Sequence, residues 1–265
     1  MPLPMQGLSF SMLWNPDVLL QAVVMQIIYL LLLSRPIRAW FSGSRKVPLS
    51  QIVSFLGGLW VFYFSFGSPI DYMSDELLFS AHMVQHMLEI MLMTPLLIYG
   101  IPDWFIRPVL KWKPSAVLFK AWTNPVASAI VFNLCFSGFH IPAIYNKTLV
   151  NDTFHLFEHA VFFATAFFMW WPLLSPLPEL HRLQSGGRLM YLLFNFNLMM
   201  PISVLLIFAQ QEWYPFYLTV PRVFGLDPVS DMQLGGLIML IGMAVPYGAS
   251  SLISYLKYNE AAWYA

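Results

Sequence analysis

Charged side chains are scarce in this sequence. Asp, Glu, Lys and Arg make up 10% of the 265 residues, whereas a soluble domain carries about 25%. The formal net charge is zero, so the chain lacks the basic excess typical of nucleic-acid-binding proteins, and we expect no nucleic-acid partner. Together with a 58% share of hydrophobic residues, this composition predicts an integral membrane protein whose main surroundings are the lipid bilayer.

Sequence features of several common sites are also missing. Cys135 is the single cysteine, which excludes an intramolecular disulfide and a paired-thiolate metal site. The chain has no G-x-S-x-G nucleophile elbow and no P-loop. Any metal site formed by one chain would therefore depend on histidine, carboxylate or methionine side chains.

Long apolar runs are abundant. Seven are long enough to cross about 30 Å of hydrocarbon at about 1.5 Å per residue; they cover residues 17–34, 49–67, 77–99, 125–144, 154–174, 188–209 and 232–256. We predict an all-α integral membrane protein in which seven transmembrane helices form a single domain over residues 1–265. Pro95, Pro201 and Pro246 lie inside three of these runs and predict kinks.

The basic residues predict how the chain crosses the membrane. Eleven of the thirteen Lys and Arg residues lie in alternate connections or after the last run, and only Lys147 and Arg222 lie on the other side. By the positive-inside rule, this asymmetry predicts an outer N-terminus and a cytoplasmic C-terminus.

Five of the six histidines are predicted to collect at the outer ends of three consecutive spans. His82 and His86 lie in the third span with Glu89 on the same helix face, and His155 and His159 repeat the i, i+4 spacing in the fifth. His140 lies near the outer end of the fourth span. Side chains at i and i+4 stack on one face, so both imidazoles of each pair can reach one metal ion.

Other residues near these histidines allow more than one interpretation. Imidazole suits copper, zinc, iron and nickel, and nearby methionine sulfur would favour Cu(I). Several carboxylates could ligate a metal or hold a histidine ring: Asp71, Asp75, Glu76, Glu158, Asp231 and the deeper Glu89. We favour a helix N-cap for Asp231, and either a supporting role or a protonated carboxyl within the bundle for Glu89. His140, taken alone, is better explained as an interhelical hydrogen-bond donor than as a ligand, and most of the methionines are expected to be packing residues.

Five strings along the chain resemble a known family. They are HMVQHML at 82–88, TPLLIYGIP at 94–102, FHIPAIY at 139–145, HLFEH at 155–159 and DMQLGGLI at 231–238. Together they resemble the multi-span CtaG family of bacterial cytochrome c oxidase assembly factors over about residues 50–245. The resemblance implies a multi-pass protein of the bacterial plasma membrane that matures haem-copper oxidase by helping copper reach its centre. The metal ligands that it implies are His82, His86, His140, His155 and His159.

Our leading hypothesis is therefore a copper-binding assembly factor rather than an enzyme. Copper, as Cu(I) or Cu(II), would be held at the histidine cluster and passed to cytochrome c oxidase subunits or to another copper chaperone. A homo-oligomer is compatible with the sequence. The main alternative is an intramembrane zinc-dependent hydrolase that uses the same histidines, with Glu89 or Glu158 as base. A third hypothesis is a haem protein with two axial histidines.

Overall fold

The computed structural model describes residues 9–177 and 179–263. These residues form helices and connecting segments, with no strand among them. Six segments are long and apolar enough to cross a membrane, and a bent helix pair forms a seventh. The six are α2 (Pro16–Leu33), α4 (Leu49–Phe66), the continuous segment Phe79–Gly100, α12 (Asp152–Leu174), α13 (Ser185–Ile207) and α14 (Pro228–Trp263). The predicted all-α transmembrane fold is confirmed.

Asparagine–proline pairs start two of these helices. Asn15 accepts hydrogen bonds from the backbone N–H groups of residues 17 and 18 at the start of α2, at 3.0 and 3.4 Å. Asn124 accepts equivalent bonds at the start of α10 (Pro125–Phe139), at 3.0 and 3.2 Å. The proline that follows each asparagine has no N–H to satisfy, so it fits the first helical position.

The fourth predicted span is bent. The structure ends α10 at Phe139 and starts α11 (Pro142–Thr148) at an angle of 77° to it. The backbone turns at His140 and Ile141 because Pro142 cannot continue the hydrogen-bonding ladder of α10 and instead begins a new helix. The straight part of this span is therefore five residues shorter than the sequence predicted.

The third span contains a π-helical turn. It runs as α6 (Phe79–Leu88), η1 (Glu89–Met93) and α7 (Thr94–Gly100), with the π turn just before Pro95. Pro95 lacks the N–H of a regular ladder, and two side chains bond to carbonyl groups of the π turn. The Thr94 hydroxyl donates to the Glu89 carbonyl at 2.8 Å, and the Trp170 indole N–H donates to the Ile90 carbonyl at 2.8 Å.

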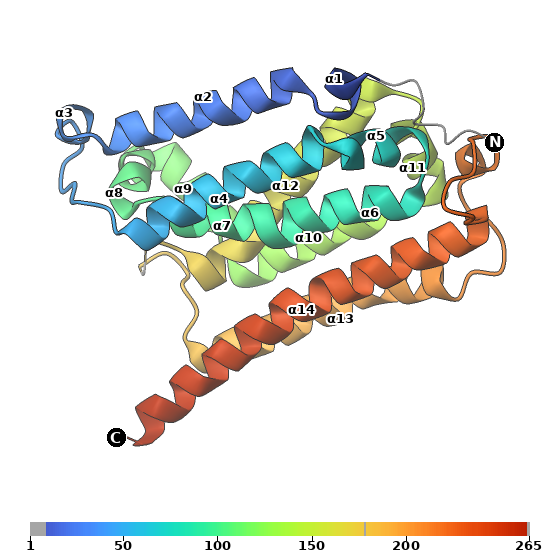
Figure 1. The fold of residues 1–265 in the computed structure, drawn as a ribbon. Coiled ribbons are helices and arrows are strands. Elements are labelled where there is room, and N and C mark those ends of the chain that lie inside the picture. The colour runs from blue at the N-terminus through green and yellow to red at the C-terminus, as the bar shows by residue number, and fades with distance from the viewer. Residues whose placement is uncertain (1–8, 178, 264–265) are drawn as a thin grey trace.

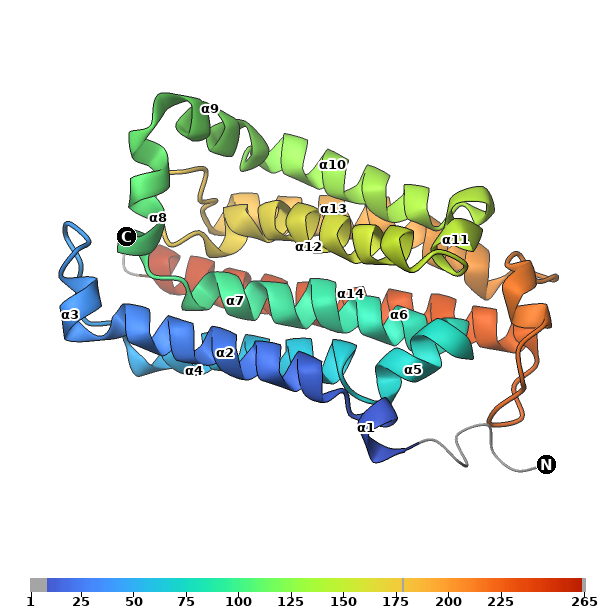
Figure 2. The same ribbon diagram turned by 90° about the horizontal axis from the view of Figure 1, so that it is seen from above.

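The two helical segments that carry the histidine pairs lie in the centre of the bundle. Figures 1 and 2 show α6, α7 and α12 between α2 and α4 on one side and α10 on the other, with α13 and α14 packed against them. In the most apolar 18-residue window, 61% of residues are buried in Phe79–Gly100 and 56% in α12, against 11% in α2. Their polar side chains are therefore shielded from lipid by other helices.

Different short helices lie at the two ends of the bundle (Figure 2). One end, here called the arginine end, carries α3 (Arg35–Arg38), α8 (Asp103–Ile106), η2 (Arg107–Lys111) and α9 (Lys113–Trp122). The opposite end, here called the histidine end, carries α1 (Phe10–Leu13), α5 (Pro69–Glu76), α11 and η3 (Pro215–Leu218). The basic connections lie at the arginine end, although the side chain of Lys257 lies outside the described part. Which end faces the cytoplasm stays a prediction from the positive-inside rule.

Candidate metal centre

A central group of three buried side chains joins α6 to α12. Nε2 of His82 lies 3.8 Å from one carboxylate oxygen of Glu158, and Nε2 of His86 lies 3.7 Å from the other. All three side chains are fully buried. These separations exceed hydrogen-bonding distance, so the carboxylate faces the two imidazoles without bonding to either of them.

The polar atoms of this central group have no hydrogen-bonding partner. Both ring nitrogens of His82, both of His86 and both carboxylate oxygens of Glu158 lack a partner among the described residues. Each unsatisfied buried polar group costs about 1–3 kcal/mol. A metal ion among these atoms would satisfy several of them at once, and two imidazoles with one carboxylate fit the donor preferences of first-row transition metals.

A deep group lies at the start of the π turn. It consists of His86, Glu89 and His159, with Nδ1 of His86 3.8 Å and Nδ1 of His159 2.8 Å from the same Glu89 oxygen. When Glu89 is ionised, His159 donates from Nδ1 and so accepts at Nε2. Nε2 of His159 lies 3.0 Å from Nε2 of His155. In this bond Nε2 of His155 carries the proton and donates it to His159.

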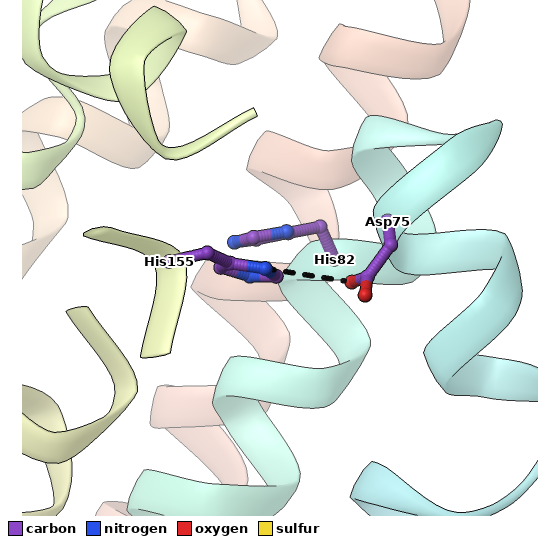
Figure 3. Close-up of side chains that lie close together, drawn as sticks. All are labelled: Asp75, His82 and His155. Atoms are coloured by element: carbon purple, nitrogen blue, oxygen red, sulfur yellow. Dashed lines mark ion pairs between the residues drawn. The ribbon is translucent and has the colours of Figure 1, made fainter. Parts of the chain in front are cut away.

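A surface group lies where α5 meets α12. Figure 3 shows Asp75, His82 and His155 with the two imidazole rings lying over one another. The ring centroids are 5.1 Å apart, and Nδ1 of His155 lies 3.7 Å from the Asp75 carboxylate. The side chain of Asp75 is 40% exposed, whereas that of His82 is fully buried. This group therefore connects the surface of the protein to the buried central group.

The surface, central and deep groups share histidines. His82 belongs to the surface and central groups, and His86 belongs to the central and deep groups. Within each group the three ligand atoms lie within 4.8 Å of one another. The three groups therefore form one continuous series of donors from Asp75 to Glu89.

His140 occupies a different environment from the other four predicted ligands. Its Nδ1 lies 2.7 Å from the Phe136 carbonyl, so Nδ1 carries the proton and donates it. The remaining nitrogen, Nε2, faces the sulfur of Met83 at 3.3 Å. The His140 ring centroid lies 6.4 Å from that of His86, beside the cluster but outside its three groups.

Polar contacts hold α6 in position. Asp231 lies in the first turn of α14, and its carboxylate accepts the backbone N–H groups of Phe79 and Ser80 at 2.8 and 3.1 Å. The sequence predicted an N-cap role for Asp231, and the structure places that role on α6 rather than on its own helix. Four N–H groups at a helix start have no partner within the helix, and Asp231 satisfies two of those of α6.

A glutamine on α6 ties it to α5 as well. The side-chain amide of Gln85 donates to the Ser65 carbonyl at 2.9 Å and to Asp71 at 2.8 Å, and its oxygen accepts from Ser74 at 2.6 Å. Burial raises the pKa of Asp71 to about 6, although the bond from Gln85 acts in the opposite direction. Burial, followed by the nearby charge of Asp71, raises the pKa of Asp75 to about 7.

The structure brings three of the candidate carboxylates together with predicted histidines. Four of the five predicted histidines fall in the three groups, which also contain Asp75, Glu89 and Glu158. The sequence contains a signal for Glu158, because position 158 is three residues after His155 and therefore shares its helix face. It could not show that Glu158 faces both His82 and His86 across the bundle, because this contact depends on how α12 is rotated.

Most of this chain matches the sequence profile of a known protein family. The sequence profile of the cytochrome c oxidase caa3 assembly factor family (Caa3_CtaG) matches residues 27–258. This chain belongs to that family. The resemblance read from the five strings is thereby confirmed, and the Caa3_CtaG match covers every residue of the three groups as well as His140. No curated protein and no solved structure matches the chain. The family and the apolar helices together make this a multi-pass protein of the bacterial plasma membrane.

Proposed function

We propose that this protein binds copper at the central group and helps to deliver it to cytochrome c oxidase. The observation that carries the proposal is the set of buried polar atoms on His82, His86 and Glu158 that have no hydrogen-bonding partner. A binding pocket for an ion would require such a set, whereas a purely structural cluster would satisfy its own hydrogen bonds. The family match supports oxidase assembly as the process that such a site would serve.

The choice of copper over other metals rests on the donors around the site. Imidazole nitrogen binds copper and zinc well, and thioether sulfur favours Cu(I). The sulfur of Met83 lies 3.3 Å from Nε2 of His140, the ring nitrogen with the free lone pair. A nitrogen–sulfur donor pair therefore lies beside the histidine–carboxylate groups. The assembly-factor family favours a non-catalytic role over the zinc-hydrolase and haem alternatives.

The shared histidines support transfer of the ion rather than permanent storage. An ion that reaches the surface group at Asp75 would move to the central group while it keeps His82 as a ligand. It would move on to the deep group while it keeps His86. Because each step retains one ligand, the ion is never released into the apolar interior, where an unpaired charge is very costly. The oxidase apoprotein or another copper chaperone would take the ion by ligand exchange.

The test is metal analysis of detergent-purified protein loaded with Cu(I), with zinc measured in the same samples. We expect bound copper in the wild type and loss of most of it in His82→Ala/His86→Ala. His181→Ala is the matched control, because His181 lies in the connection between α12 and α13 and outside the three groups. The proposal fails if the wild type binds no copper, if zinc binds in its place, or if the double variant keeps its copper.

A further inference from the structure

A large cavity lies at the arginine end, far along the bundle from the histidine groups. Its volume is about 930 Å³, and it lies among the start of α4, the end of α7, the end of α12, the start of α13 and the late part of α14. Pockets of roughly 300–1,000 Å³ are the usual size for organic ligands. The histidine groups do not use this cavity, so a separate explanation is needed.

The cavity is lined by an excess of basic side chains. Its wall contains Arg45, Lys46, Arg107, Arg182 and Arg188. Asp103 and Glu179 are the acidic side chains in the same wall, so five cations face two carboxylates and leave an excess of three positive charges. Such an excess attracts an anionic ligand.

The ion pairs around the cavity leave some of these cations free. Arg107 pairs with Glu179 at 2.5 Å and with Asp103 at 3.5 Å, and Arg45 pairs with Asp103 at 3.4 Å. Lys46 and Arg182 have no ion pair within the described ranges, and both side chains are exposed. Basic groups are therefore available at the cavity to bind phosphate oxygens.

The inner wall of the cavity is apolar. Trp170, Leu173 and Leu192 line it and are almost completely buried. The indole N–H of Trp170 is already bonded to the Ile90 carbonyl, so this side chain offers the cavity an apolar surface. A ligand that matches both walls has an anionic head and an apolar body.

Part of the cavity wall lies on the outer surface of two membrane-spanning segments. Tyr99 on α7 and Ile253 on α14 both line the cavity and are about half exposed, at 45% and 52%. Figure 1 shows α13 and α14 leaning away from α4 and α7 toward this end.

We propose that this cavity binds the headgroup of an anionic glycerophospholipid, with the acyl chains leaving between α7 and α14. Basic pockets between transmembrane helices are suited to such headgroups because cations meet the phosphodiester while lipid-facing walls meet the glycerol and the chains. The site is independent of the proposed copper function, because none of its residues belongs to the histidine groups.

The experiment measures lipid binding to the full-length protein in a neutral detergent. Phosphatidylglycerol, phosphatidylcholine and inorganic phosphate are each titrated, with thermal stabilisation and native mass spectrometry as readouts. We expect phosphatidylglycerol to bind, and to stabilise the protein more than the other two. In Arg45→Gln/Lys46→Gln/Arg182→Gln its affinity should fall about a hundredfold, since each basic side chain near an anionic headgroup contributes roughly a factor of five.

Lys111→Gln/Lys113→Gln/Lys120→Gln is the matched control. These lysines are exposed at the same end of the bundle but do not line the cavity. Equal losses in the two triple variants would show general surface electrostatics and overturn the proposal. Equal binding of phosphatidylcholine would also overturn it, as would inorganic phosphate that stabilises as well as the lipid. If the first triple variant does not fold, as judged by size exclusion, Arg182→Gln alone should lose about fivefold.

Discussion

The two ends of this bundle differ in how closely their helices pack. At the histidine end α14 lies so close to its neighbours that an added Cβ at Gly235 would come 2.3 Å from Phe79, and one at Gly236 would come 2.9 Å from the backbone of α13. At the arginine end a cavity of about 930 Å³ lies beside the late part of the same helix, whose Gly248 faces outward and would meet no atom within 4 Å if it carried a Cβ. Along α14, close helix packing therefore accompanies the polar side chains that must be held at fixed distances.

The two ends also differ in how far their ionisable side chains are buried and paired. The single carboxylate and the two imidazoles of the central group are buried and lack hydrogen-bonding partners, whereas the arginine end pairs its carboxylates with partly exposed guanidinium groups. Desolvated donors at fixed positions suit the binding of a small ion, because little reorganisation is needed when the ion arrives. Exposed basic side chains suit a larger amphiphilic ligand.

The largest effect is expected when the central carboxylate loses its charge. Glu158→Gln keeps the shape of the side chain but removes the charge that faces His82 and His86. We expect the affinity for Cu(I) to fall by about 10–100-fold, the range typical of changes in groups that support a metal. Competition with a Cu(I) chelator measures this.

Glu76→Gln, which neutralises an exposed carboxylate on α5, is the control and should keep the wild-type affinity. Phosphatidylglycerol should raise the melting temperature of both variants as much as it raises that of the wild type. If Glu158→Gln also lost its response to lipid, the two ends would not be independent.

A smaller effect is expected from a matched pair of glycine substitutions on α14. In Gly236→Ala the new methyl group would meet backbone atoms of residues 203 and 207 at 2.9 Å, so we expect the free energy of unfolding to fall by about 1–3 kcal/mol. Gly248→Ala has room for its methyl group and should gain up to about 1 kcal/mol from helix propensity. Thermal unfolding in detergent separates the two. Equal melting temperatures would refute the contrast in packing along α14.

The smallest effect concerns the pH dependence of stability. The pKa of Asp71 is raised from 3.8 to about 6 in the folded protein, so between these values the folded state binds a proton that the unfolded state has released. The free energy of unfolding should therefore decrease as pH rises from about 4 to about 6. Asp71→Asn should make this part of the profile less steep, because only the raised pKa of Asp75 then contributes from the same helix, and it should be more stable, relative to wild type, at pH 7 than at pH 4.

Asp17→Asn, at an exposed carboxylate in the first turn of α2, serves as the control for this measurement. Its profile between pH 4 and pH 6 should follow that of the wild type. A wild-type profile that rises with pH over this interval would contradict the assignment to Asp71.

The sequence predicted the spans well because apolar runs and Asn-Pro starts are local signals. The start of α2 at Pro16 and the end of α4 at Phe66 lie one residue from their predicted positions. The bend at His140 was missed, since hydropathy counts apolar residues whether or not the helix stays straight. Pro142 was the local signal for it, because proline starts α11 there.

The sequence predicted where the site residues lie along their helices, but not how each helix is rotated about its axis. Helical spacing placed His82 with His86 and His155 with His159 at one end of the bundle, which the structure confirms. It could not separate His140 from these pairs, because the rotation of α10 that brings His140 against Met83 is set by packing between helices. The same limit applies to Glu158. The metal itself and the orientation of the chain in the membrane stay predictions.

The π turn at Glu89–Met93 changes the rotation of α7 relative to α6 within the third span. A π turn contains one more residue than an α turn, and one residue corresponds to about 100° of rotation around the axis. The surface that α6 presents to α12 is therefore set separately from the surface that α7 presents to α4, where Gly100 lies so close that an added Cβ would be 2.5 Å from Phe55. The extra residue shifts the phase of the helix, so that the donors on α6 face α12 while α7 packs against both α4 and α12.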